Sequence, residues 1–176
     1  MLKKLSVLIV LFVSVFTVSV VSSSFAADSE PRRVSKHGDW GVYVFNDESG
    51  NKVCYMSSQP KKSEGKYSRR GEVIVFITHW TVDNTKNVVS VSTGYPYKTG
   101  SEASILVDGR KFKLFTRGET AWAEEQETDD ALVASIKRGS KMVLKGTSKR
   151  GNLTTDTFSL KGSTDAYKAL NRACSS

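Results

Sequence analysis

The sequence contains few of the side chains from which catalytic and metal sites are usually built. It has two histidines and two cysteines in 176 residues, and these do not follow the ligand spacing of a zinc site. The Gly-x-Ser-x-Gly turn of many hydrolases and the glycine motifs that hold phosphate groups are also missing. We therefore expect a protein that is not an enzyme and that carries no cofactor and no metal.

The two histidines and one acidic run are the remaining candidates for chemistry. His37 lies in a polar segment before the first expected strand, so we expect it to be exposed and without a role. His79 stands at a strand end, where a partly buried structural histidine is favoured over a catalytic base. The acidic run at 124–130 lacks the spacing and the glycine of an EF-hand loop, which favours a solvated loop and helix cap over a calcium site.

Long apolar runs are missing except at the N-terminus. Lys3 and Lys4 precede an apolar run at 5–21, and Ser24-Phe25-Ala26 offers small residues at a cleavage site. This is the layout of a secretory signal peptide, although the run is long enough to suggest a permanent anchor as the alternative. The small residues favour cleavage after Ala26. We expect a periplasmic, outer-envelope associated or secreted protein with no transmembrane segment after cleavage.

The charge is basic. The chain has 26 Lys+Arg against 18 Asp+Glu, and removal of residues 1–26 takes away Lys3 and Lys4, which leaves 24 against 18 and a net charge of +6. A basic balance suggests nucleic acid as a partner, but an exported protein does not meet nucleic acid in the cell. We expect instead an attraction to anionic envelope or host surfaces.

The two cysteines, Cys54 and Cys174, lie 120 positions apart, the second close to the C-terminus. In an oxidising compartment an even number of cysteines indicates a disulfide. Such a bridge would tie the last helix to an early strand and prevent the fraying expected of a terminus. A reactive thiol pair is the alternative, but the Cys-x-x-Cys spacing typical of that chemistry does not occur.

Most of the chain reads as short strands separated by turns. Alternating or β-branched and aromatic segments occur at 39–45, 53–56, 73–80, 88–91, 105–107, 112–115, 120–123, 142–144 and 154–160. Asp108-Gly109 predicts a tight hairpin because both residues tolerate positive φ. We predict an all-β fold, an antiparallel β-sandwich.

Two short peripheral helices complete the prediction. Asp129-Asp130 can cap a helix at 131–138 that ends at a glycine, and Ser163 or Thr164 can cap a final helix. The domain organisation follows as a signal peptide at 1–26, a flexible lead-in at 27–36 and one sandwich domain at 37–176.

Two segments are candidates for contact with a partner. The connector at 61–70 is basic and carries a tyrosine, and the loop at 94–100 holds two tyrosines beside a proline. Exposed aromatics beside cations suit anionic glycans, lipid headgroups or a protein partner, whereas ordinary solvated loops are the alternative. The candidate partner surface consists of Lys61, Lys62, Lys66, Tyr67, Arg69, Arg70, Tyr95 and Tyr97.

Several segments resemble one protein family in their order along the chain. They are Gly38-Asp39-Trp40, KVCYMSSQPKK (52–62), the runs at 89–123 and 132–170, and the closing Cys174. These residues are similar to the invasion-associated locus B family. The resemblance implies an exported bacterial protein with an all-β sandwich fold, of a kind linked to host-cell entry. It carries over no catalytic residues.

The resemblance also bears on the cysteines. Many members of that family have a further cysteine in the first strand, where this chain has Tyr43-Val44-Phe45. That departure leaves Cys54 and Cys174 as the possible pair here.

We therefore interpret the sequence as an exported binding protein of the bacterial envelope, with a role in envelope maintenance or host interaction. Two alternatives stay open. A periplasmic hydrolase would need a Ser/His/Asp cluster around His79. A structural or chaperone-like envelope protein would bind promiscuously and have no defined pocket.

Overall fold

The computed structural model of the protein describes residues 30–175, so the expected signal peptide lies outside the described residues. The strands are β1 (Arg32–His37), β2 (Trp40–Asn46), β3 (Lys52–Ser58), β4 (Lys62–Gly65), β5 (Ile74–Trp80), β6 (Val88–Ser92), β7 (Glu102–Val107), β8 (Arg110–Arg117), β9 (Thr120–Trp122), β10 (Lys141–Thr147) and β11 (Leu153–Ser159). The helices are α1 (Gln126–Arg138) and α2 (Ser163–Ser175). Neither described helix combines the length and the apolar character that a membrane crossing requires.

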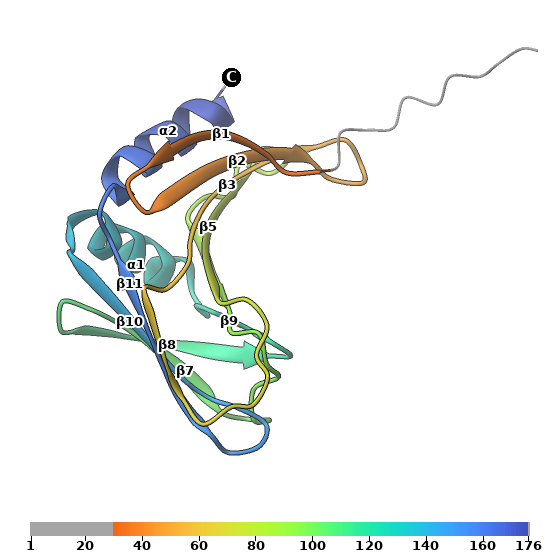
Figure 1. The fold of residues 1–176 in the computed structure, drawn as a ribbon. Coiled ribbons are helices and arrows are strands. Elements are labelled where there is room, and N and C mark those ends of the chain that lie inside the picture. The colour runs from red at the N-terminus through yellow and green to blue at the C-terminus, as the bar shows by residue number, and fades with distance from the viewer. Residues whose placement is uncertain (1–29, 176) are drawn as a thin grey trace, which may run out of the picture.

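All strands belong to one antiparallel sheet with the order β1-β2-β3-β5-β6-β9-β8-β7-β10-β11-β4, which confirms the predicted all-β class. Residues 59–61 alone connect β3 to β4, although β4 is the last strand in that order. An extended chain spans at most about 3.6 Å per residue, so the far edge of the sheet must return close to β3. The sheet therefore folds over on itself into an open, sandwich-like shape (Figure 1).

Hydrogen bonds between the two ends of the sheet hold this shape. The backbone N–H of Lys61 donates to the carbonyl of Thr157 in β11 at 2.7 Å. The indole N–H of Trp40, at the start of β2, donates to the carbonyl of Ser159 at 3.2 Å. The beginning and the end of the chain's strand region are thus joined, and a continuous interior is enclosed between them.

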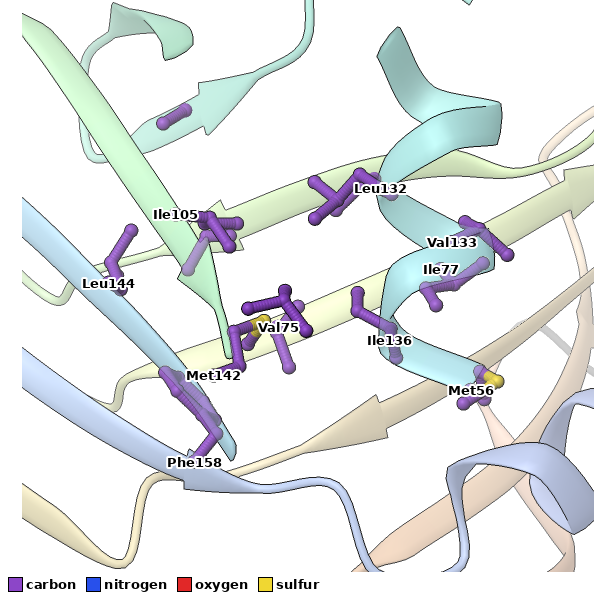
Figure 2. Close-up of a cluster of buried hydrophobic side chains, with 14 of the residues drawn as sticks. Met56, Val75, Ile77, Ile105, Leu132, Val133, Ile136, Met142, Leu144 and Phe158 are labelled. Atoms are coloured by element: carbon purple, nitrogen blue, oxygen red, sulfur yellow. The ribbon is translucent and has the colours of Figure 1, made fainter. Parts of the chain in front are cut away.

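Side chains of α1, and of strands on both sides of the fold in the sheet, fill the interior. The face of α1 that carries Leu132, Val133 and Ile136 is buried and points at side chains of strands from both halves, among them Ile77 and Met142 (Figure 2). The helix was expected at the periphery. One face of the helix packs against the core, and Gln126, Glu127, Asp130 and Arg138 are exposed, so the helix covers one side of the core and keeps a solvent-facing surface as a peripheral helix does.

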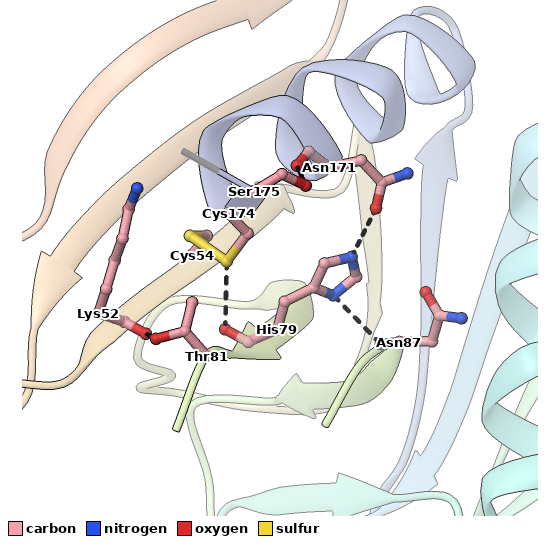
Figure 3. Close-up of a disulfide and its surroundings, with 8 residues drawn as sticks. All are labelled: Lys52, Cys54, His79, Thr81, Asn87, Asn171, Cys174 and Ser175. Carbon is pink, nitrogen blue, oxygen red and sulfur yellow. Dashed lines mark hydrogen bonds between the residues drawn. A yellow bond between two sulfur atoms is a disulfide. The ribbon is translucent and has the colours of Figure 1, made fainter. Parts of the chain in front are cut away.

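The second helix covers β1, β2 and β3, and a disulfide attaches its C-terminal end. Cys174 bonds to Cys54 in β3, with 5.8 Å between the two Cα atoms, and Figure 3 shows the bridge beneath the last turn of α2. The predicted disulfide is confirmed. Cys54 is fully buried, so the terminus is tied into the core rather than to the surface.

Three boundaries differ from the prediction. Residues 32–36 were expected in a flexible lead-in, but they form most of β1, because they pair with β2 at the edge of the sheet. Part of the connector forms β4, which pairs with β11. Helix α1 begins at Gln126, a turn earlier than expected, with Glu125 rather than Asp129-Asp130 at its N-cap.

The predicted hairpin at Asp108-Gly109 is confirmed between β7 and β8. Both residues have positive φ, 43° and 95°, as a two-residue turn between antiparallel strands requires. The Asp108 carboxylate also accepts hydrogen bonds from the backbone N–H groups of Ser140 and Lys141. A local turn signal thus also anchors the start of β10.

The disulfide predicts a large loss of stability in Cys174→Ser. Because the bridge closes a loop with a sequence separation of 120, its removal should lower the free energy of unfolding by about 2–5 kcal/mol. Urea denaturation under non-reducing conditions measures the loss. Ser175→Ala, which leaves the bridge intact, is the control. Two titratable thiols in the native wild-type protein, or equal stability of Cys174→Ser and wild type, would contradict the assignment.

The first turn of α1 predicts a dependence of stability on pH. Asp129 is 6% exposed and its carboxylate accepts the backbone N–H of Val89 at 2.9 Å. Burial raises the pKa of Asp129 to about 6, and the nearby Asp130 adds to the rise while the bond from Val89 opposes it. A raised folded-state pKa means that the folded state favours the protonated carboxyl, so stability is lost as the pH rises from about 4 through 6.

At pH 7.5 the free energy of unfolding of Asp129→Asn should therefore be higher than that of wild type by about 1–3 kcal/mol. The amide oxygen of the asparagine can still accept the Val89 N–H, and the side chain carries no charge. The difference from wild type should disappear near pH 4. Urea titrations at pH 4, 5, 6 and 7.5 test this. A constant difference at all four pH values would contradict the raised pKa.

Candidate functional site

One end of the molecule carries a pocket of about 390 Å³ that three separate segments line. They are the connector between β4 and β5, the loop between β6 and β7, and the turn between β10 and β11. The connector and the β10–β11 turn lie together at the lower end of the ribbon in Figure 1. We call this the end pocket. The two segments singled out in the sequence thus meet in one place, and a third segment joins them.

A close approach of two backbones holds the connector against the β6–β7 loop. The N–H of Gly71 donates to the carbonyl of Gly94 at 2.8 Å. Gly94 has a φ of +65°, and a Cβ atom at this position would lie 2.3 Å from the backbone of Gly71. A side chain does not fit there and would strain the backbone. The contact between the connector and the β6–β7 loop is therefore fixed by the backbone.

Arg70 was expected on the partner surface, and this expectation is wrong. Its side chain is 5% exposed and that of Asp156 in β11 is fully buried. The guanidinium donates two parallel hydrogen bonds to the Asp156 carboxylate, at 2.8 and 2.7 Å, and a third to the carbonyl of Thr93 at 2.7 Å. It also stacks between the rings of Tyr67 and Tyr95. Arg70 points inward because its guanidinium pairs with the buried carboxylate of Asp156 on the facing strand.

Tyr95 and Tyr97 were also expected to be exposed, and they are buried, at 8% and 5% exposure. The Tyr95 hydroxyl shares a hydrogen bond of 2.6 Å with the hydroxyl of Thr154, which forms part of the pocket floor. Burial raises the pKa of both phenols above the usual value. The loop turns its rings inward against each other, with 5.5 Å between ring centroids, so they belong to the core.

The remaining cations of the connector fall into two groups. Lys61 and Lys62 are in ion pairs, with Asp39 at 2.6 Å and with Glu64 at 2.8 Å. Lys66 and Arg69 are exposed and line the end pocket. Tyr67 stands beside them at the surface, 41% exposed.

The β10–β11 turn adds two cations that the sequence analysis did not assign to the partner surface. Lys149 and Arg150 are exposed and line the same pocket. The sequence placed them in a hairpin candidate, and two adjacent cations before a glycine turn were the available signal. Within the described residues, none of Lys66, Arg69, Lys149 and Arg150 forms an ion pair, and no acidic residue lines the pocket.

His79 is the residue that would act as the catalytic base in the hydrolase alternative. It is 1% exposed, which makes it more buried than expected. Its Nδ1 accepts the backbone N–H of Asn87 at 3.2 Å, so Nε2 carries the proton and donates to Asn171 at 3.0 Å (Figure 3). The ring lies edge-on to Tyr167. Both nitrogens are thus satisfied by amides, and the described residues place no Ser/His/Asp cluster here.

The other expectations for chemistry concern His37 and the metals. His37 ends β1, is half-buried and hydrogen-bonds to the hydroxyl of Ser35. Among residues 30–175, no group of three His, Cys, Asp or Glu side chains is arranged to hold a metal ion. The acidic run expected in a solvated loop lies mostly in the first turns of α1.

The buried ion pair beneath the pocket predicts an unequal response to two adjacent substitutions. Arg70→Met leaves the buried Asp156 carboxylate without its partner and should lower the free energy of unfolding by about 3–5 kcal/mol. Arg69→Gln alters an exposed cation and should change it by less than about 0.5 kcal/mol. Urea denaturation compares the two variants.

A double variant separates the ion pair from the packing around it. Arg70→Met with Asp156→Leu removes both charges and should be less destabilised than Arg70→Met alone. Equal stability of Arg70→Met and Arg69→Gln would show that the buried pair does not support the fold.

Comparison with known proteins identifies a family. The family model described as Invasion associated locus B (IalB) protein matches residues 40–171. The matched span contains all three segments of the end pocket as well as Cys54 and Asp156. No curated protein and no solved structure matches the chain.

Proposed function

The chain belongs to the invasion associated locus B family, and on that premise we propose that it is a non-enzymatic binding protein, exported to the bacterial envelope, whose end pocket receives an anionic partner. Membership supports an invasion-associated exported protein at the level of the family. The nature of the partner is the step that we add. It rests on the charges that surround the end pocket.

The observation that carries the proposal is the contrast between paired and unpaired cations. Lys61, Lys62 and Arg70 each have a carboxylate partner. Lys66 and Arg69 follow in the same connector without one, and Lys149 and Arg150 face the same pocket without one. Four unpaired cations around one concave site create a positive potential that raises the local concentration of anions.

The physical form of the pocket favours recognition over simple attraction. Cations on a flat surface are screened within about 8–10 Å at ordinary ionic strength, and they mainly accelerate encounter. A pocket of about 390 Å³ has room to surround an anionic group, and Tyr67 and the hydroxyl of Thr154 offer contacts of other kinds. A defined pocket also favours a specific partner over the promiscuous binding of a chaperone-like envelope protein.

The expected compartment narrows the choice of partner. A protein that crosses the inner membrane meets anionic glycans and lipid headgroups of the envelope, and at the surface those of a host cell. We therefore propose an anionic component of the envelope or of the host surface as the partner, and a role in envelope maintenance or host interaction. The arrangement of His79 does not favour the hydrolase alternative.

The proposal predicts that the four pocket cations control envelope association. A variant with Lys66, Arg69, Lys149 and Arg150 all changed to glutamine should fold normally, because the four side chains are exposed. Its association with isolated envelopes should be weaker than that of wild type at low salt, and should depend less on salt. Co-sedimentation at 50 mM and 500 mM sodium chloride measures both effects, and urea denaturation checks the fold.

A matched variant controls for net charge. The chain also has exposed cations outside the end pocket, among them Arg32, Arg33, Lys36 and Lys86. Their change to glutamine removes two arginines and two lysines, as many of each as the pocket variant removes. This variant should keep most of its envelope association. Equal retention of both variants and wild type at both salt concentrations would overturn the proposed function. An equal loss in both variants would reduce it to a non-specific charge effect.

A further inference from the structure

The end pocket has two cationic walls that belong to different segments of the chain. Lys66 and Arg69 lie on the connector after β4, whereas Lys149 and Arg150 lie on the turn between β10 and β11. Each wall thus carries one lysine and one arginine. A single compact anion can be neutralised by one wall, so the duplication needs a reason.

Both walls are attached to the loop that lies between them. On the connector side, Gly71 donates to the carbonyl of Gly94 at 2.8 Å. On the hairpin side, the N–H of Lys149 donates to the carbonyl of Pro96 at 2.7 Å. Gly94 and Pro96 themselves line the pocket. The backbone therefore sets the separation of the two walls before any ligand arrives.

A further contact fixes the orientation of each wall. Arg70, the residue after Arg69, is held by the buried Asp156 and by the carbonyl of Thr93. In the hairpin, the N–H of Asn152 donates to the hydroxyl of Ser148 at 3.2 Å. The backbone positions of the four cations are thus set by the fold, whereas their exposed side chains remain free to change rotamer. A ligand with an anion for each wall relieves the repulsion between these like charges, and it has to order only the side chains, because the backbone that carries them is already in place.

The floor between the walls has no charge of its own at the surface. The uncharged residues that line the pocket include the exposed Tyr67 and the mostly buried Tyr95 and Thr154, whose hydroxyls are hydrogen-bonded to each other. Asp156 lies beneath, but Arg70 covers and neutralises it. Such a floor suits the uncharged, hydroxyl-bearing body of a ligand, and a pocket of about 390 Å³ lies in the range that holds small molecules.

We propose that the end pocket takes a ligand with two separated anionic groups on a sugar-sized polar body, one anion for each wall. This inference rests on the proposed function and adds to it the chemical class of the ligand. Phosphorylated sugars of free glycans and the headgroups of lipids with two phosphates share this chemistry. The arginine of each wall can bind a phosphate through two parallel hydrogen bonds, and the lysine adds a point charge.

The first test compares three soluble probes by isothermal titration calorimetry of the folded protein at low salt. Fructose 1,6-bisphosphate carries two separated phosphates, fructose 6-phosphate carries one, and inorganic pyrophosphate carries two that are adjacent. The bisphosphate should bind at least about tenfold tighter than either of the others. Pyrophosphate is the control for total charge, because its two phosphates are adjacent rather than separated by a sugar-sized body.

Variants of the separate walls form the second test. Lys66→Gln with Arg69→Gln removes the connector wall, and Lys149→Gln with Arg150→Gln removes the hairpin wall. Each double variant should lower the affinity for the bisphosphate to about that for the monophosphate. Each should change the affinity for the monophosphate by less than about threefold, because the other wall still binds it.

Vesicles distinguish the two sources of the ligand. Phosphatidylcholine vesicles that contain cardiolipin present two phosphates on a glycerol body, and those with phosphatidylglycerol present one. Retention by cardiolipin that the bisphosphate competes away assigns a lipid headgroup, and tight binding of the soluble bisphosphate without retention assigns a free glycan.

Equal affinity for the bisphosphate and pyrophosphate, sensitivity to one wall alone, or no binding of any probe would overturn the two-anion ligand. The proposed function would still stand if the four-cation variant lost its envelope association.

Discussion

The buried ion pair between Arg70 and Asp156 is the contact on which both the closed shape of the sheet and the form of the end pocket depend. Arg70 comes from the connector, Asp156 from β11, and the third hydrogen bond of the guanidinium reaches Thr93 just after β6. Three segments that are distant in the sequence therefore meet at one planar group. Two buried charges are tolerated because each of them is hydrogen-bonded, and because the rings of Tyr67 and Tyr95 enclose the guanidinium.

The disulfide has a corresponding role away from the pocket. It attaches the end of α2 to β3, beside the buried His79, whose two ring nitrogens are both hydrogen-bonded. One covalent contact thus attaches α2 to β3, one ionic contact attaches the connector to β11, and α1 packs its buried face against the core. Because the frame is held in this way, the backbone positions of the end-pocket cations do not depend on carboxylate partners of their own.

The errors of the sequence analysis at the candidate site have one physical origin. Arg70, Tyr95 and Tyr97 stand in polar, turn-rich segments, and such segments usually run over the surface. Whether a given side chain in them points inward depends on the facing strand, where Asp156 and Thr154 receive Arg70 and Tyr95. No short-range pattern contains that information. Lys149 and Arg150 were left out of the partner surface for the same reason. Their hairpin lies next to the connector because β11 pairs with β4, and the sequence does not show that pairing.

The sequence by itself determined the local features of this protein. Alternation of apolar side chains gave most of the strands, Asp108-Gly109 gave its hairpin, and two cysteines in an expected oxidising compartment gave the disulfide, since each depends on neighbouring residues or on a count. The tertiary structure alone decided that β4 pairs with β11, that α1 packs its buried face against strands distant in the sequence, and that four cations from two segments surround one pocket. These features depend on how an 11-stranded sheet curves back on itself, and that curvature follows from the packing of the whole core.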